Sequence, residues 1–190
     1  MSAVVAPRRV PGVEGVWVFV GMDMMFFLIL FMSFMNGRSE APELYEAGRL
    51  TLDPDFGGIN TLILLTSSWF FVLAVESAQR DRLQEIPRWL VASFLCGVAF
   101  GISKALEYGA KLASGITPAT NEFYMYYFVL TGIHLLHVIG GCVMLLLFWR
   151  MARRGAFGPQ RIAVIESGGI YWHMVDLLWI FLFPLLYLLR

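Results

Sequence analysis

Several acidic and imidazole side chains lie inside apolar stretches of this sequence. Asp23, His134 and Asp176 each have mainly aliphatic and aromatic neighbours. A charged group in the middle of a bilayer costs about 2.5–3.5 kcal/mol, so such groups face the protein interior and often serve function. We expect the three to share an interior polar cluster. It would be either a proton or lipid-headgroup site or a set of interhelical hydrogen bonds that fixes the packing.

His134 and His137 are three residues apart and share one face of a helix. This spacing could indicate a metal or haem ligand pair, and a membrane enzyme or a cytochrome b-like protein would use it with the third histidine, His173. A zinc site requires three or four protein ligands, and no other known metal-ligand spacing occurs here. We interpret the histidines as hydrogen-bonded packing residues and expect no metal, haem or catalytic centre in this chain.

A second pair of polar residues lies in the last apolar stretch. His173 and Asp176 are three residues apart, so we expect the imidazole to donate a hydrogen bond to the carboxylate. Trp172, Asp176, Trp179 and Phe183 follow helical spacing, which places the acid within an aromatic ridge. This face is therefore predicted to contact protein rather than lipid.

Two further patterns concern the third and fourth apolar stretches. Lys104 and Glu107 are three residues apart and are predicted to form a local ion pair near the outer membrane interface. Gly97 and Gly101 form a GxxxG pair, and Gly141 lies in the next stretch. Because small residues allow helices to approach closely, we expect the tightest contact between these two stretches.

The composition defines the elements that must position these residues. Of the 190 residues 58% are hydrophobic and 15% charged, with a mean hydropathy of +0.69, whereas soluble domains carry about 25% charged residues. A bilayer core of about 30 Å takes about 20 helical residues to cross. Five stretches are long enough, which predicts an all-α, polytopic membrane bundle of five transmembrane helices: Val16–Met35, Gly58–Ser77, Trp89–Tyr108, Phe123–Trp149 and about Ala163–Leu189.

The basic residues predict the orientation of this bundle, since positively charged loops stay cytoplasmic. With five spans, one side of the membrane holds nine basic residues: Arg8, Arg9, Arg80, Arg82, Arg88, Arg150, Arg153, Arg154 and Arg161. The other side holds four: Arg38, Arg49, Lys111 and Arg190. We therefore predict a cytoplasmic N-terminal tail at residues 1–15, one transmembrane domain at residues 16–190, and a periplasmic C-terminus. The zero net charge and the lack of a basic run argue against nucleic-acid binding.

Four motifs in order resemble subunit III of the haem-copper oxidases. They are Met22-Asp23 with Phe26-Phe27, Lys104 with Glu107-Tyr108, Thr131-Gly132 with His134, His137, Val138 and Gly140-Gly141, and Tyr171-Trp172-His173 with Asp176, Trp179 and Phe183. The family patterns are S-E-x-x-F-F, E-Y, T-G-x-H-x-x-H-V-x-x-G and Y-W-H-F-V-D-x-x-W. The resemblance extends over essentially the whole chain from Val16 onward.

Two departures from the family pattern matter. Many members have seven helices, whereas five are expected here, as in the shorter quinol-oxidase type and in the NorE-like branch associated with nitric oxide reduction. The short chain, the acidic first loop and the Asn121–Phe128 run favour the NorE-like branch. Asp23 replaces the family's intramembrane glutamate with a side chain one methylene shorter, so the proton-related role of that glutamate does not transfer directly.

The resemblance implies a non-catalytic accessory subunit in a bacterial inner membrane. It would pack against catalytic subunit I of a haem-copper oxidase or a nitric oxide reductase, and haem and copper would belong to that partner alone. It would bind phospholipid in a cleft between its first two helices and the rest, and support assembly, proton uptake and turnover stability. The residues taken over from the family motifs as lipid- or proton-related are Asp23, Glu107, His134, His137, His173 and Asp176, with Trp172, Trp179, Gly132 and Gly141 as packing residues.

The alternative from a different class is a small proton-coupled transporter or channel that uses Asp23, His134 and Asp176 as a relay. The sequence has no internal repeat and no pair of Gly/Pro-broken helices, which transporters commonly use. These features favour the accessory subunit.

The predicted orientation can be tested by labelling single introduced cysteines from outside intact cells. Because Ser39 follows the first span and Gln84 follows the second, a membrane-impermeant reagent should modify Ser39→Cys and leave Gln84→Cys unmodified. The opposite labelling pattern would show that the N-terminus is outside.

Overall fold

The computed structural model describes residues 10–155, 157 and 161–189. Within these residues the chain is helical and contains no strand. Five helices are long and apolar enough to cross a membrane. The elements are α1 (Glu14–Glu40), α2 (Pro42–Arg49), α3 (Pro54–Gln79), α4 (Ile86–Ala113), α5 (Glu122–Arg153), α6 (Ile162–Phe183) and a short π-helix, η2 (Pro184–Leu188).

The five predicted spans are confirmed, and the first four helices extend beyond their apolar stretches at both ends. Polar residues outside the hydrocarbon core provide the extra turns and their caps. The Asp53 carboxylate accepts hydrogen bonds from the backbone N–H groups of Asp55 and Phe56, which begins α3. The Asn121 side chain does the same for Tyr124 at the start of α5. Periodic hydrophobicity locates the membrane core of a helix, whereas these caps locate its end.

The acidic connection after the first span contains a helix that was predicted as a loop. α2 starts with Pro42, whose fixed φ suits the first helical turn. It buries Tyr45 and Gly48 against the bundle. Arg49 forms an ion pair with Glu46 at 2.5 Å and also donates to the Tyr187 carbonyl oxygen at 3.4 Å. Since α2 is too short to show a clear apolar period, the sequence pattern could not distinguish it from a turn.

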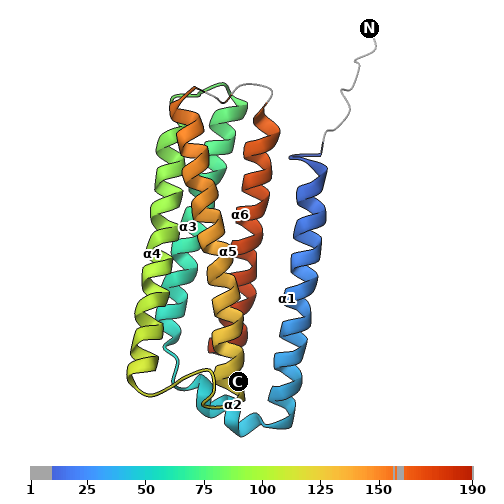
Figure 1. The fold of residues 1–190 in the computed structure, drawn as a ribbon, viewed down its shortest axis with the longest axis vertical. Coiled ribbons are helices and arrows are strands. Elements are labelled where there is room, and N and C mark those ends of the chain that lie inside the picture. The colour runs from blue at the N-terminus through green and yellow to red at the C-terminus, as the bar shows by residue number, and fades with distance from the viewer. Residues whose placement is uncertain (1–9, 156, 158–160, 190) are drawn as a thin grey trace.

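Helices α3 to α6 form the body of the bundle, and α1 lies along one side of it (Figure 1). Within the most apolar window of each span, 11% of the α1 residues are buried in the protein, compared with 50% in α6. α6 is the central helix, since α1, α3 and α5 all pack on it. Helix α1 therefore exposes most of its surface, in agreement with its apolar side chains on every face.

The connections gather at two ends, as five antiparallel spans require (Figure 1). The α3–α4 connection, the end of α5 and the start of α6 lie at the end where α1 begins, and α2 and the α4–α5 connection lie at the other. The N-terminal end of α1 thus lies on the same side as the second and fourth connections, as predicted. Which side is cytoplasmic stays a prediction. Residues 1–9 of the predicted tail, with Arg8 and Arg9, and also Arg190 lie outside the described residues. In residues 10–13, the Gly12 N–H donates to Glu166 on α6.

The GxxxG pair predicted the tightest contact between α4 and α5, and this prediction was wrong. α4 packs more extensively on α3 than on α5, and no neighbouring atom lies close to the position of a Cβ on Gly101. Gly97 does lie against α5, with the Cys142 sulfur 2.8 Å from where its Cβ would be. The closest approach made possible by a motif glycine is at Gly141, where a Cβ would lie 2.1 Å from Cζ3 of the buried Trp172.

We predict that Gly141→Ala destabilises the protein by about 1–3 kcal/mol, because the new methyl group forces the Trp172 indole out of its packed position. Gly101→Ala is the matched control, since nothing within 4 Å meets its Cβ. Both can be compared by thermal unfolding in detergent. Equal unfolding temperatures for the two variants would contradict this account of Gly141.

Candidate functional site

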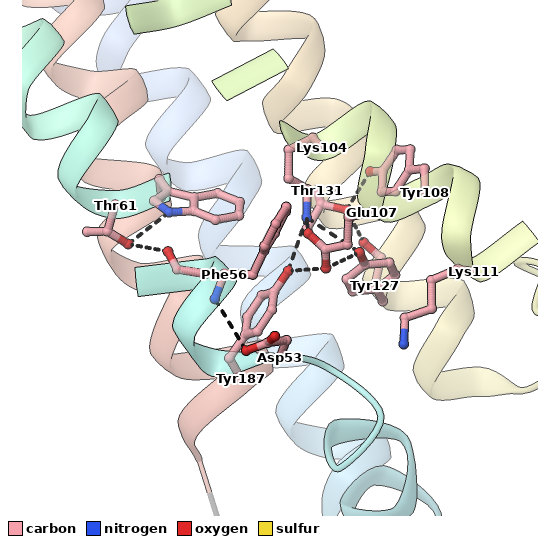
Figure 2. Close-up of polar contacts among 12 residues, drawn as sticks. Asp53, Phe56, Thr61, Lys104, Glu107, Tyr108, Lys111, Tyr127, Thr131 and Tyr187 are labelled. Carbon is pink, nitrogen blue, oxygen red and sulfur yellow. Dashed lines mark hydrogen bonds and ion pairs between the residues drawn. The ribbon is translucent and has the colours of Figure 1, made fainter. Parts of the chain in front are cut away.

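A buried ion pair lies where α4, α5 and η2 meet (Figure 2). Lys104 Nζ lies 2.8 Å from Glu107 Oε2, and the side chains are 0% and 11% exposed. The predicted pair is thus confirmed. Helix α5 and the last turns of the chain cover the pair, and its place near the outer membrane interface stays a prediction. The i,i+3 spacing on α4 brings the two groups together, and the neighbouring helices exclude water.

Two tyrosines complete the polar contacts of this pair. Glu107 Oε1 accepts hydrogen bonds from the hydroxyls of Tyr127 at 2.7 Å and Tyr187 at 2.6 Å. The Tyr187 oxygen in turn accepts from Lys104 Nζ at 3.1 Å. Both carboxylate oxygens and the ammonium group therefore have partners, which is the condition for retaining a buried charge pair. Figure 2 shows these side chains converging from α4, α5 and η2.

Aromatic rings surround the ammonium group of Lys104. The ring centres of Tyr108, Tyr127, Trp179 and Tyr187 lie between 5.1 and 5.7 Å from Nζ. The face of an aromatic ring attracts a cation, and more strongly where water is excluded. The rings therefore reduce the cost of burying the charge. The sequence analysis missed Tyr127 and Tyr187, because they lie on other helices and no sequence spacing relates them to Lys104.

A second polar pair connects α1 to α5. His137 Nε2 lies 3.1 Å from Asp23 Oδ1, and His137 Nδ1 lies 2.8 Å from the Ile133 carbonyl oxygen. A carbonyl oxygen only accepts, so Nδ1 carries a proton. The contact with Asp23 then needs one more proton, which resides either on His137 or on the carboxylate. The contact thus contains one shared proton, and in either arrangement the two residues together carry no net charge.

The predicted cluster of Asp23, His134 and Asp176 does not form as one hydrogen-bonded group. Asp23 pairs with His137, one turn from the expected partner. His134 is fully buried, and its Nε2 contacts the Val175 carbonyl oxygen at 3.0 Å. Comparable depth in the membrane does not specify partners, because the rotation of each helix decides which side chains meet.

The predicted hydrogen bond between His173 and Asp176 is absent. His173 Nδ1 instead forms a short hydrogen bond with the Ser68 hydroxyl of α3, and the buried Asp176 carboxylate makes no bond to His173. The two residues do lie on neighbouring positions of α6, but α3 packs against this helix and offers His173 a closer partner. The three-residue spacing does place His173 and Asp176 close together on α6, but the predicted hydrogen-bond partner of His173 was wrong.

The tryptophans of the predicted aromatic ridge point into the bundle, as expected. The Trp172 indole N–H donates to Ser67 at 3.1 Å, and that of Trp179 donates to Thr61 at 3.0 Å (Figure 2 includes the latter bond). Both rings are fully buried. Gly132 lies opposite Tyr108, whose hydroxyl is 3.9 Å from the position of a Cβ. The two indole hydrogen bonds attach α6 to α3.

An apolar groove of about 360 Å³ lies between α1 and α6. Its walls are formed by Gly21, Met24, Met25, Leu28, Phe31 and Phe181. The family resemblance implied a cleft between the first two spans and the rest. The structure differs, because the second span, α3, packs closely on α4 and α6 and only α1 is set apart. Asp23 is on the same helix as five of the groove residues, beside Met24.

Comparison with known proteins identifies the family. The model of the cytochrome c oxidase subunit III family matches residues 10–189. The chain belongs to the cytochrome c oxidase subunit III family. It is 28% identical over 176 residues to a probable cytochrome c oxidase subunit 3 of Mycobacterium tuberculosis, covering 93% of this chain and 87% of that protein. It is 32% identical over 176 residues to cytochrome c oxidase subunit 3 of a Synechocystis species, covering 92% and 74%.

The family match covers all the polar residues described above. The matched residues include all five spans and every motif residue that carried the resemblance. Among the described residues, no group of three or more His, Cys, Asp and Glu could hold a metal ion. The described residues provide a buried Lys104–Glu107 pair, a partly exposed Asp23–His137 pair and an apolar groove between α1 and α6.

We predict that Lys104→Met destabilises the protein by about 3–5 kcal/mol, because it leaves the Glu107 carboxylate buried without its cation. The double variant Lys104→Met/Glu107→Gln should lose less than the sum of the single variants, as expected for coupled groups. Thermal unfolding in detergent measures both.

The matched control for this prediction is an exposed ion pair. Arg80 and Glu76 lie 2.6 Å apart with side chains 59% and 41% exposed, so Arg80→Met should cost only about 0–1 kcal/mol. Equal losses of stability for Lys104→Met and Arg80→Met would show that the buried ion pair stabilises the protein no more than an exposed one.

Proposed function

We propose that this chain is a non-catalytic accessory subunit of a haem-copper oxidase in a bacterial inner membrane. The observation that carries the proposal is the match of the subunit III family model to residues 10–189, together with five membrane spans. The relatives named above are cytochrome c oxidase subunits, which favours an oxidase as the parent complex. Haem and copper would lie in the catalytic subunit I beside it.

The groove between α1 and α6 supports a role in lipid binding. It is lined by aliphatic, thioether and aromatic side chains, which suit an acyl chain. Residues such as Met22 and Ile29 are exposed on α1, at 71% and 61%, so a lipid in the groove would continue the apolar surface between α1 and the bundle. A phospholipid held there would strengthen the attachment of the most weakly packed helix.

The Asp23–His137 pair supports a role in proton uptake by the partner. It contains one shared proton between α1 and α5, and the side chains are 12% and 18% exposed. Asp23 stands where the family has a glutamate. The 3.1 Å contact of this shorter side chain with His137 supports a role for Asp23 in place of that glutamate. In this role the pair stores a proton near the groove, while the chemistry of oxygen reduction stays in subunit I.

The main competing partner is a nitric oxide reductase, as in the NorE-like branch. The short chain and acidic first loop favour that branch, and the names of the relatives favour the oxidase. A proton-coupled transporter would need a path through the bundle. The interior beside Lys104 is instead closed by Tyr127 and Tyr187, which are fully buried.

Affinity purification of the tagged chain from its native membranes tests the proposal. We expect a haem-copper oxidase to co-purify, with its haem absorbance in stoichiometric amount. Deletion of the chain should leave oxidase spectra in the membrane but shorten the period over which the enzyme sustains turnover. Recovery of a nitric oxide reductase would support the competing branch, and recovery of the chain alone with transport activity in vesicles would refute the accessory role.

A further inference from the structure

A groove of about 720 Å³ lies where α4 begins and α5 ends. It is separate from the α1–α6 groove and differs in character. The start of α4 contributes Pro87, Arg88 and Val91, and the end of α5 contributes Trp149 and Arg153. Two cationic side chains thus meet an apolar wall. None of the described residues that line the groove is acidic.

Both arginines lie against indole rings. The Arg88 guanidinium carbon is 4.6 Å from the ring centre of Trp89, and that of Arg153 is 5.4 Å from the ring centre of Trp149. A guanidinium group that contacts an aromatic face still presents N–H donors at its edge, in the geometry that suits a phosphate. Glu85 approaches Arg88 at 3.1 Å and occupies part of that edge. Since arginine has five N–H donors, further donors stay free for a ligand.

The location of the groove points to the membrane surface. Tryptophans flanked by arginines at the ends of transmembrane helices are typical of the membrane–water interface. This is also the end of the bundle that carries the larger share of basic residues and is predicted to be cytoplasmic. No side chain caps the start of α4, so the backbone N–H groups there add to the positive potential. Basic pockets between transmembrane helices at such a surface bind anionic lipid headgroups.

We propose that this groove binds an anionic phospholipid. Its phosphate lies between Arg88 and Arg153, and an acyl chain follows Val91 and Pro87 toward the membrane core. The two cations select an anionic lipid over a zwitterionic one, and the apolar wall selects a lipid over free phosphate. The site needs only the membrane bundle itself, so anionic-lipid binding is independent of whether the parent complex is an oxidase.

The test compares full-length variants in nanodiscs of phosphatidylcholine with a minor fraction of phosphatidylglycerol. Native mass spectrometry then measures the phosphatidylglycerol retained by the chain. We expect Arg88→Gln/Arg153→Gln to lower the apparent affinity by about 25-fold, with about fivefold from each arginine. Arg80→Gln is the matched control, because Arg80 is 59% exposed and paired with Glu76, as Arg88 is 60% exposed and paired with Glu85.

A second variant tests the apolar wall without changing charge. Val91 is 36% exposed in the groove, so Val91→Trp should fill the acyl path and reduce retention of phosphatidylglycerol while the helical circular dichroism stays unchanged. Equal loss in the Arg80→Gln control would overturn the site. Retention unaffected by Val91→Trp, or displacement of the lipid by inorganic phosphate, would show that the groove recognises an anion rather than a lipid.

Discussion

The pairing of Lys104 with Glu107 determines how the far end of this bundle closes. A lysine surrounded by apolar helices is tolerated only when its charge and its hydrogen bonds are satisfied. Of its hydrogen-bond partners in the described residues, Glu107 lies on the same helix, and the others come from elsewhere. Tyr127 comes from α5 and Tyr187 from η2. The requirement to satisfy one charge therefore fixes the relative position of three elements, and the aromatic contacts of Trp179 add α6 to the same centre.

The other side of the bundle is held by weaker and more scattered polar contacts. α6 is connected to α3 through Ser67, Ser68 and Thr61, each of which binds a ring nitrogen of the aromatic ridge or its histidine. Such hydrogen bonds orient helices in an environment where burial of apolar surface provides little driving force. Helix α1 depends on fewer contacts, and the hydrogen bonds of Asp23 with His137 and of Ser33 with Tyr126 connect it to α5. A graded bundle results, with a firmly fixed centre and one loosely held outer helix.

The sequence predicted the number and type of the elements well, because hydrocarbon thickness sets a length that the apolar stretches must match. It also predicted the Lys104–Glu107 pair and the inward-facing Trp172 and Trp179, which depend on spacing within one helix. Partners on different helices were beyond this reasoning. His173 forms its hydrogen bond with Ser68 rather than Asp176, and Asp23 contacts His137 rather than His134. These partners depend on the rotation and packing of the helices, which hydrophobic periodicity does not determine. Helix α2 was missed because its eight residues are too few to show a clear hydrophobic periodicity.

The position of Tyr187 has a consequence for how the protein is made. Lys104 enters the membrane with the third span, whereas the hydroxyl that completes its surroundings belongs to the fifth. During synthesis the lysine has Glu107 beside it from the start and gains Tyr127 with the next helix, but its final partner arrives only after η2 has left the ribosome. The bundle can therefore reach its mature packing only after its last span is inserted, and until then the Lys104 charge lacks one of its hydrogen-bond partners.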